Sequence, residues 1–210
     1  MGLLGDEDPA VRKGAEAALA RMGDAAREAL RAALDAPDPE VAGRARALYR
    51  PLAAKGLELS LRPAASDPFS LYVSCFLKNP EAVPLVAVRS HFYFQSRVLW
   101  SFEDPEGSPA WVREVWRHGC SDIHPFEDRD FIVIPPGETR NVGWIEVPHR
   151  SRPGGRGRVV AKYLFKRPDE IDPRYFPNAR LRQLYLDAVE VDGILSPALE
   201  LETPPPAARP

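Results

Sequence analysis

Near residue 56, the apolar residues of this 210-residue chain change from a helical spacing to strict alternation. Residues 1–56 are rich in alanine, contain four prolines and have neither tryptophan nor phenylalanine. Residues 57–210 hold the other nineteen prolines, all four tryptophans and all nine phenylalanines. Because proline disrupts a helix interior, so many prolines exclude a mainly helical chain. The sequence therefore predicts a multidomain protein, with a helical unit over 1–56 and an all-β unit after it.

A short motif occurs twice in the first unit, at Asp8–Val11 and thirty residues later at Asp38–Val41. Aspartate caps a helix N-terminus, and proline at the first helical position loses no hydrogen bond. After each motif the apolar residues keep to one helix face. They are Val11, Ala15, Ala18, Leu19 and Met22, and then Val41, Ala45, Leu48, Tyr49 and Leu52. A further amphipathic helix is predicted between the copies, at Ala26, Leu30, Ala33 and Leu34.

This pattern resembles the short HEAT-like repeat of bacterial proteins, a type also found in phycobilisome lyases. The residues that carry the resemblance are Asp8, Pro9, Val11, Arg12, Ala15, Leu19, Gly23, Ala26, Leu30 and Leu34. The second copy departs from the pattern at Ala42, where the family favours arginine. The resemblance implies stacked helical hairpins that contact other proteins, and it does not imply lyase chemistry. A plain three-helix cap is the alternative, because a stable solenoid normally needs more repeats.

From residue 57 onward, short alternating segments are separated by proline and glycine turns. Leu57–Leu61 alternates strictly, and Phe69–Leu77 has one continuous apolar face. Further strands are predicted within 84–104 and at 131–134, 142–147, 159–165, 189–191 and 195–201. Asp192-Gly193 is typical of a hairpin turn. About seven to nine short strands of this kind predict an antiparallel β-sandwich.

Pro135–Thr139, between two predicted strands, resembles the Pro-Gly-Glu corner of bacterial immunoglobulin-like domains. Residues 157–163 and 196–201 resemble the next strand and the closing strand of that fold. The resemblance implies an immunoglobulin-like β-sandwich over 57–203. It departs from antibody domains at Phe165, where those domains have cysteine, so we expect Cys75 to be a buried apolar residue. Residues 204–210 are rich in proline and are predicted to be a disordered tail.

The densest group of possible metal ligands is His118, Cys120, Asp122 and His124, with Glu127 and Asp128 just beyond. Imidazole and thiolate together suit zinc or copper. However, no second pair of ligands stands at a recognised spacing, and one extended stretch rarely wraps a metal in a tetrahedron. We therefore assign no metal site and expect a polar loop here. A metal-binding protein that uses His118, Cys120 and His124 is kept as the alternative function.

Catalysis is not expected from these residues. Cys120 lies so close in sequence to His118 and His124 that the side chains cannot easily converge on one reacting atom. The chain contains no Gly-x-Ser-x-Gly elbow and no glycine-rich motif for nucleotides, so we expect no catalytic residues and no cofactor. The stretch 149–158 has four arginines and three glycines but no aromatic residue for base stacking, so a solvated loop is favoured over nucleic-acid binding.

Two further features bear on function. The four tryptophans Trp100, Trp111, Trp116 and Trp144, with Phe92, Tyr93 and Phe94, are either sandwich packing or a glycan surface, and packing is favoured. The chain has no apolar run long enough to span a membrane and no secretory signal at Met1, so as it stands we expect it to be cytoplasmic. Together these observations predict a non-catalytic protein-interaction or structural scaffold, with another protein as partner and an open oligomeric state.

Overall fold

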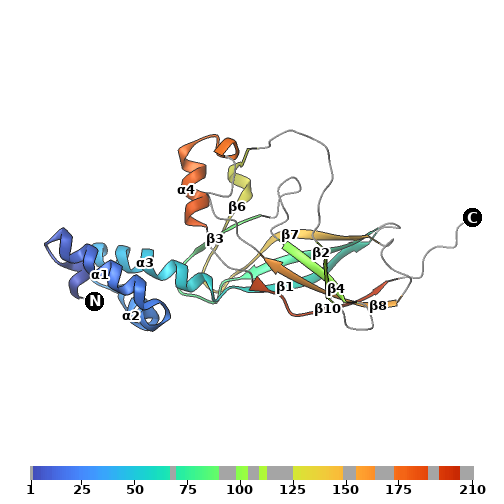
Figure 1. The fold of residues 1–210 in the computed structure, drawn as a ribbon, viewed down its shortest axis with the longest axis horizontal. Helices are drawn as coiled ribbons and strands as arrows, with labels where there is room; N and C mark the ends of the chain where they lie inside the picture. Colours follow the sequence, from blue (N-terminus) through green and yellow to red (C-terminus); the bar gives the residue numbers. More distant parts are fainter. Residues whose placement is uncertain are drawn as a thin grey trace, which may run out of the picture.

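The computed structural model describes residues 2–66, 70–89, 98–103, 109–112, 125–148, 155–163, 173–188 and 194–203. Over these residues the chain is a mixed α/β protein, with α1, α2 and α3 at one end of a set of antiparallel strands and α4 beside β3 and β6 (Figure 1). The helices are α1 (Pro9–Met22), α2 (Arg27–Ala32), α3 (Pro39–Ala54) and α4 (Ala179–Asp187). The strands are β1 (Glu58–Ser66), β2 (Ser70–Lys78), β3 (Leu85–Val88), β4 (Val98–Glu103), β5 (Pro109–Val112), β6 (Phe131–Ile134), β7 (Thr139–Pro148), β8 (Gly155–Tyr163), β9 (Ile194–Leu195) and β10 (Leu199–Thr203).

The two Asp-Pro motifs begin α1 and α3, as predicted. The Asp8 carboxylate accepts a hydrogen bond from the Ala10 amide at 2.8 Å, and Asp38 accepts one from the Glu40 amide at 2.8 Å. In each helix the proline follows the capping aspartate and occupies the first turn, where its missing N–H has no intrahelical partner to lose. The sequence therefore determined where these two helices start.

The predicted HEAT-like hairpin repeat is wrong. Between α1 and α3 only the six residues of α2 are α-helical, and they are flanked by 3-10 turns at Gly23–Ala26 and Ala33–Asp35. A hairpin needs two helices long enough to bury each other's apolar faces, and α2 is too short to be such a partner. The burial is accordingly uneven, since α1 has no buried residue while α3 has six.

Gly43, inside α3, offers a test of helix stability. A Cβ added at Gly43 would meet nothing within 4 Å, so Gly43→Ala is expected to raise the free energy of unfolding by about 0.5–1 kcal/mol through helix propensity. The matched control is Gly137→Ala, which also has open space around its Cβ but has a φ of +74°. That control is expected to lower the free energy of unfolding by about 1–2 kcal/mol, because a side chain is strained in this backbone region. Urea unfolding of both variants would measure the two changes in the free energy of unfolding. A change in the same direction for both variants would contradict this account.

The predicted immunoglobulin-like sandwich is also wrong. The described strands form three small antiparallel sheets, with orders β1-β2-β7, β10-β8-β4-β5 and β3-β6, and β9 pairs with β8. The stretch expected to be all-β contains the helix α4, and Ala188 directly after it bridges to Val86 of β3. Alternation determines which residues share a strand face, but it leaves open which strand lies alongside. The predicted strand at 195–201 is split into β9 and β10, and 189–191 lies outside the described residues.

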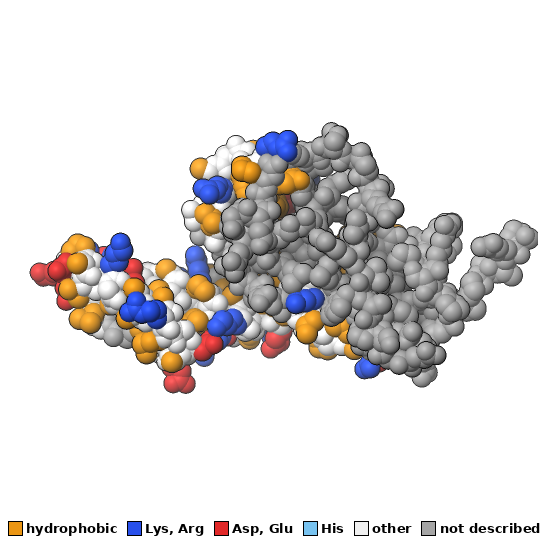
Figure 2. Space-filling model, viewed as in Figure 1, with side chains coloured by type: hydrophobic (Ala, Val, Ile, Leu, Met, Phe, Trp, Pro, Cys, Tyr) orange, Lys and Arg blue, Asp and Glu red, His pale blue; other side chains and the backbone are white. Residues whose placement is uncertain are grey.

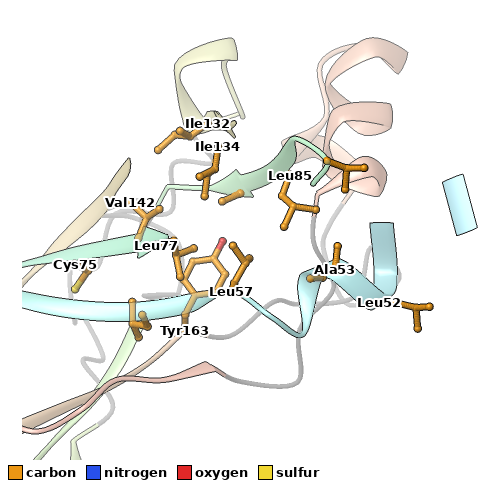
Figure 3. Close-up of a cluster of buried hydrophobic side chains, with 14 of the residues drawn as sticks. Leu52, Ala53, Leu57, Cys75, Leu77, Leu85, Ile132, Ile134, Val142 and Tyr163 are labelled. Carbon is orange, nitrogen blue, oxygen red and sulfur yellow. The ribbon is translucent and has the colours of Figure 1, made fainter. Parts of the chain in front are cut away.

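One apolar core joins the helices to the sheets. Leu52 and Ala53 of α3 belong to the same buried cluster as Leu77 of β2, Leu85 of β3 and Tyr163 of β8 (Figure 3). The change near residue 56 falls between the end of α3 and the start of β1. The division into domains 1–56 and 57–203 stays a prediction, and residues 204–210 lie outside the described part of the chain.

A polar contact also connects these parts. The Glu81 carboxylate, between β2 and β3, accepts hydrogen bonds from Arg27 Nη2 at 2.5 Å and from the Tyr49 hydroxyl at 2.6 Å. Tyr49 is fully buried, and burial together with the hydrogen bond to Glu81 raises the pKa of its hydroxyl. The contact therefore holds α2 and α3 against the segment that leads into β3.

The two-stranded sheet β3-β6 lies between this core and α4. Leu85, Ala87, Ile132 and Ile134 belong to the main cluster. Of the alternate residues, Val86, Val88 and Phe131 pack instead in a second cluster with residues from α4 and the segments beside it, while Val133 is exposed. That cluster contains Val86, Val88, Phe126, Phe131, Tyr175, Phe176, Tyr185 and Ala188. Both faces of this small sheet are therefore largely covered by apolar side chains.

Candidate functional site

His118, Cys120, Asp122 and His124 lie outside the described residues, so the proposed metal-binding loop stays untested. The two acidic residues that follow it are in structural contacts. Glu127 forms a reciprocal capping box with Asp130, and Asp128 accepts a hydrogen bond from Arg180 of α4 at 3.1 Å. Within the part of the chain that the structure describes, no group of three or more His, Cys, Asp or Glu residues is placed to hold a metal ion.

Cys75 on β2 is buried, as expected, and burial raises the pKa of its thiol from 9.0 to about 12. Only the thiolate is a good nucleophile, so native Cys75 is expected to resist iodoacetamide until the pH approaches that value. Peptide mapping by mass spectrometry would follow the modification of Cys75 in native and in urea-unfolded protein. Equal labelling rates in the two states at neutral pH would contradict its burial.

The arginine-rich stretch is only partly described. Residues 149–154 lie outside the described residues, and Arg158 at the far end of the stretch is on β8. Its guanidinium forms an ion pair with Glu200 on the neighbouring strand β10, with Nε and Oε1 2.7 Å apart. Arg158 therefore contributes to strand pairing. On the helical segment, acidic and basic side chains are interspersed over the visible face (Figure 2).

Among the aromatic residues singled out from the sequence, Trp144 can be placed on a surface. Trp116 and residues 92–94 lie outside the described residues, while Trp100 lies on β4 and Trp111 on β5. Trp144 lies on β7 and is 38% exposed. Its ring meets that of Tyr72 edge to face, with the ring centroids 5.2 Å apart.

Strand register explains why Trp144 and Tyr72 share a face. On β2, Val73, Cys75 and Leu77 are buried, so the alternate residues Tyr72, Ser74 and Phe76 point to the opposite side. Ser74 pairs with Trp144 of β7 on one side and with Arg62 of β1 on the other. Residues that pair directly point to the same face of a sheet. The outer side of sheet β1-β2-β7 therefore carries Arg62, Tyr72, Ser74, Phe76 and Trp144, hereafter the aromatic face.

The aromatic face has a small centre and a rim of large side chains. The half-buried Ser74 lies in the middle of β2, between Tyr72 and Phe76. The Arg62 guanidinium carbon lies 4.6 Å from the centroid of the Phe76 ring, which is a cation–π geometry. This arrangement presents flat aromatic surface and one positive charge around a small hydroxyl. It is suited to binding rather than to proton or group transfer.

Trp144 stands out in the sequence as a possible surface residue, whereas Arg62, Tyr72 and Phe76 do not. The apolar face that includes Val73, Cys75 and Leu77 predicts the strand, and it assigns no role to the residues on the opposite face. The alternation contained a signal, since Tyr72 and Phe76 stand two positions on either side of Ser74. Nothing in the local pattern showed that β7 and β1 would flank β2.

Comparison with known proteins gives no family for the chain, since no family model and no curated protein matches it. Among solved structures it is similar to the alkylpurine DNA glycosylase AlkC of Pseudomonas fluorescens, bound to DNA that contains an abasic site analogue, with 15% sequence identity. The similarity covers 76% of this chain and 46% of that chain, so this chain spans less than half the length of the glycosylase. With a TM-score of 0.26, the similarity supports no inference about fold or function.

Proposed function

We propose that this chain is a non-catalytic protein-interaction or structural protein that binds another protein through the aromatic face. The observation that carries the proposal is the exposed Trp144 in edge-to-face contact with Tyr72, with Arg62 on the same sheet face across Ser74. Tryptophan, tyrosine and arginine are the residues that contribute most often to protein–protein binding energy. A group of these three types on a rigid sheet, with Trp144 and Arg62 exposed and Tyr72 half-buried, favours a protein partner.

The geometry and charge favour a protein over a nucleic acid or a membrane. The chain has a formal net charge of -2, so it has no general attraction for polyanions. On sheet β1-β2-β7 several charges beside the aromatic face are paired across or along the strands, as in Lys78 with Glu58 and Arg140 with Glu138. No helix among the described residues combines the length and apolar character needed to cross a bilayer.

The test compares Trp144→Ala with a matched control, Leu195→Ala. Leu195 is 57% exposed but lies on β9, which belongs to a different sheet. Tagged wild type and both variants would be expressed in the source cells, and proteins retained by wild type but not by Trp144→Ala would be identified by quantitative mass spectrometry. Binding of the purified partner would then be measured by calorimetry.

We expect Trp144→Ala to weaken this binding by about 30-fold or more, as is usual for truncation of an aromatic anchor, while Leu195→Ala binds as wild type does. Circular dichroism would establish that each variant is folded. Equal partner binding by wild type and Trp144→Ala would contradict the proposal. Trp144-dependent binding of an oligosaccharide in the absence of any protein partner would contradict it too.

A further inference from the structure

Strand β6 has the composition of an interior strand although it lies at a sheet edge. Its residues Phe131–Ile134 are all apolar, and none is charged. Ile132 and Ile134 face the main core (Figure 3), while Phe131 packs against Phe126 with ring centroids 5.7 Å apart. Within the described residues β6 pairs only with β3. Natural edge strands are normally protected by charges, prolines or bulges, and none of these lies within β6.

The register of this pair fixes which backbone groups of β6 point away from β3. The Arg89 amide donates to the Asp130 carbonyl at 2.7 Å, and the ladder continues with Val88 opposite Phe131 and Val86 opposite Val133. In an antiparallel pair, alternate residues direct both backbone polar groups toward the neighbouring strand. Ile132 and Ile134 therefore bond to β3, whereas Phe131 and Val133 direct their N–H and C=O groups to the opposite edge.

Contacts on β3 independently confirm this alternation. The Tyr163 hydroxyl accepts from the Val88 amide at 3.1 Å and donates to the Val88 carbonyl at 3.0 Å, and Val86 forms a parallel bridge with Ala188. Val86 and Val88 thus direct their backbone groups away from β6. Their partners Val133 and Phe131 must likewise direct their backbone groups away from β3. The outer edge of β3 is therefore covered by other parts of the chain.

The outer edge of β6 lacks this cover in the described part of the chain. The Phe131 amide donates to the Asp128 carbonyl in the preceding 3-10 turn. Among the residues that the structure describes, neither the Phe131 carbonyl nor the two backbone polar groups of Val133 have a hydrogen-bond partner. The Val133 side chain is 56% exposed, which is unusual for valine in a strand of this composition. The edge thus combines unpaired backbone groups with exposed apolar surface.

We propose that this edge pairs with β6 of a second copy of the chain, so that two β3-β6 sheets become one four-stranded antiparallel sheet. With Phe131 opposite Val133 of the second copy, each Val133 amide can donate to a Phe131 carbonyl, and the two-fold symmetry provides this bond twice. The same register places an aromatic side chain opposite a β-branched one on the same face, which is a favourable cross-strand pair. Because β6 has no charge, two antiparallel copies meet without like-charge repulsion.

The test uses the full chain and the substitution Val133→Lys, with Leu195→Lys as control. The two side chains are almost equally exposed, at 56% and 57%, and both lie on strands. Sedimentation velocity over a wide range of protein concentration would measure self-association. We expect wild type and Leu195→Lys to dimerise, and we expect Val133→Lys to raise the dissociation constant at least about ten-fold, since charges on an edge oppose strand pairing.

Hydrogen exchange of wild-type protein supplies a measurement that needs no variant. The Val133 amide is expected to become more protected as the protein concentration rises, while the Ile132 amide is protected by β3 at every concentration. A monomeric wild type at all concentrations, a dimer unaffected by Val133→Lys, or concentration-independent exchange at Val133 would each overturn the proposal. Pairing of this edge with a different protein while the chain stays monomeric would also overturn it.

This inference is independent of the proposed function. Trp144 lies on sheet β1-β2-β7 and Val133 on sheet β3-β6. Trp144→Ala is therefore expected to leave self-association unchanged, and Val133→Lys to leave binding at the aromatic face unchanged. The two proposals can fail separately.

Discussion

Replacement of Asn79 by alanine is expected to lower the free energy of unfolding by about 3–5 kcal/mol, the largest effect of a single substitution that we predict. Asn79 is fully buried at the end of β2. Its side-chain amide donates to the carbonyls of Val83 at 2.8 Å and Ile134 at 2.9 Å, and its side-chain carbonyl accepts from the Glu81 amide at 3.0 Å. Alanine removes all three bonds.

The cost is large because the site is buried, so the Val83 carbonyl and the Glu81 amide lose their partner there, while the Ile134 carbonyl keeps only its bond to β3. Each buried polar group left without a partner costs about 1–3 kcal/mol. Alanine keeps the backbone bond of 2.7 Å from the Gly137 amide to the carbonyl of residue 79, so the loss comes from the side-chain bonds. Asn79→Asp is expected to be no better, because it keeps the acceptor but removes the donors and buries a carboxylate.

The measurement is urea unfolding followed by circular dichroism, with Asn141→Ala as control. Asn141 is exposed on β7, and its side chain accepts from the Gly143 amide at 3.0 Å. Because water can replace that bond at the surface, the control is expected to change the free energy of unfolding by no more than about 1 kcal/mol. Similar losses for Asn79→Ala and Asn141→Ala would show that the buried network around Asn79 does not stabilise the fold as argued.

The second large effect is expected for Tyr163→Phe, which should lower the free energy of unfolding by about 2–4 kcal/mol. The buried hydroxyl of Tyr163 on β8 makes two hydrogen bonds to the backbone of Val88 on β3, one as donor and one as acceptor. Phenylalanine keeps the ring and its packing but leaves both the amide and the carbonyl of Val88 unpaired. The loss of stability therefore reports the hydrogen bonds between two sheets and not the creation of a cavity.

Two measurements check this prediction. Chemical unfolding gives the free energy, and native-state hydrogen exchange should show faster exchange at the Val88 amide in particular. Tyr72→Phe is the matched control, because its half-buried ring lies on the outer side of sheet β1-β2-β7, where water can replace a lost partner. A loss of stability in Tyr163→Phe no greater than in Tyr72→Phe, with unchanged exchange at Val88, would contradict the role assigned to the hydroxyl.

Local sequence chemistry was sufficient to predict where two helices start and where most of the described strands lie. Asp8 and Asp38 cap α1 and α3 because an aspartate followed by proline satisfies a helix N-terminus with residues adjacent in sequence. The alternation around Cys75 predicted β2 and the burial of that thiol. The wrong predictions concern the segments between these elements and the way the elements pack. The helix α2 is shorter than a hairpin needs, and the helix α4 lies within a stretch expected to be all-β.

The sequence by itself determined which residues can begin a helix and which share a strand face, because those properties depend on neighbours a few residues away. Only the tertiary structure decided that Ser74 lies between Arg62 and Trp144, that Tyr163 bonds to Val88, and that β6 forms a separate sheet with β3. Many strands of similar pattern satisfy the same local rules. The choice among their pairings is made by hydrogen bonds and side-chain packing between residues far apart in the chain. Those contacts built the aromatic face and, among the described residues, left the outer edge of β6 without a partner strand.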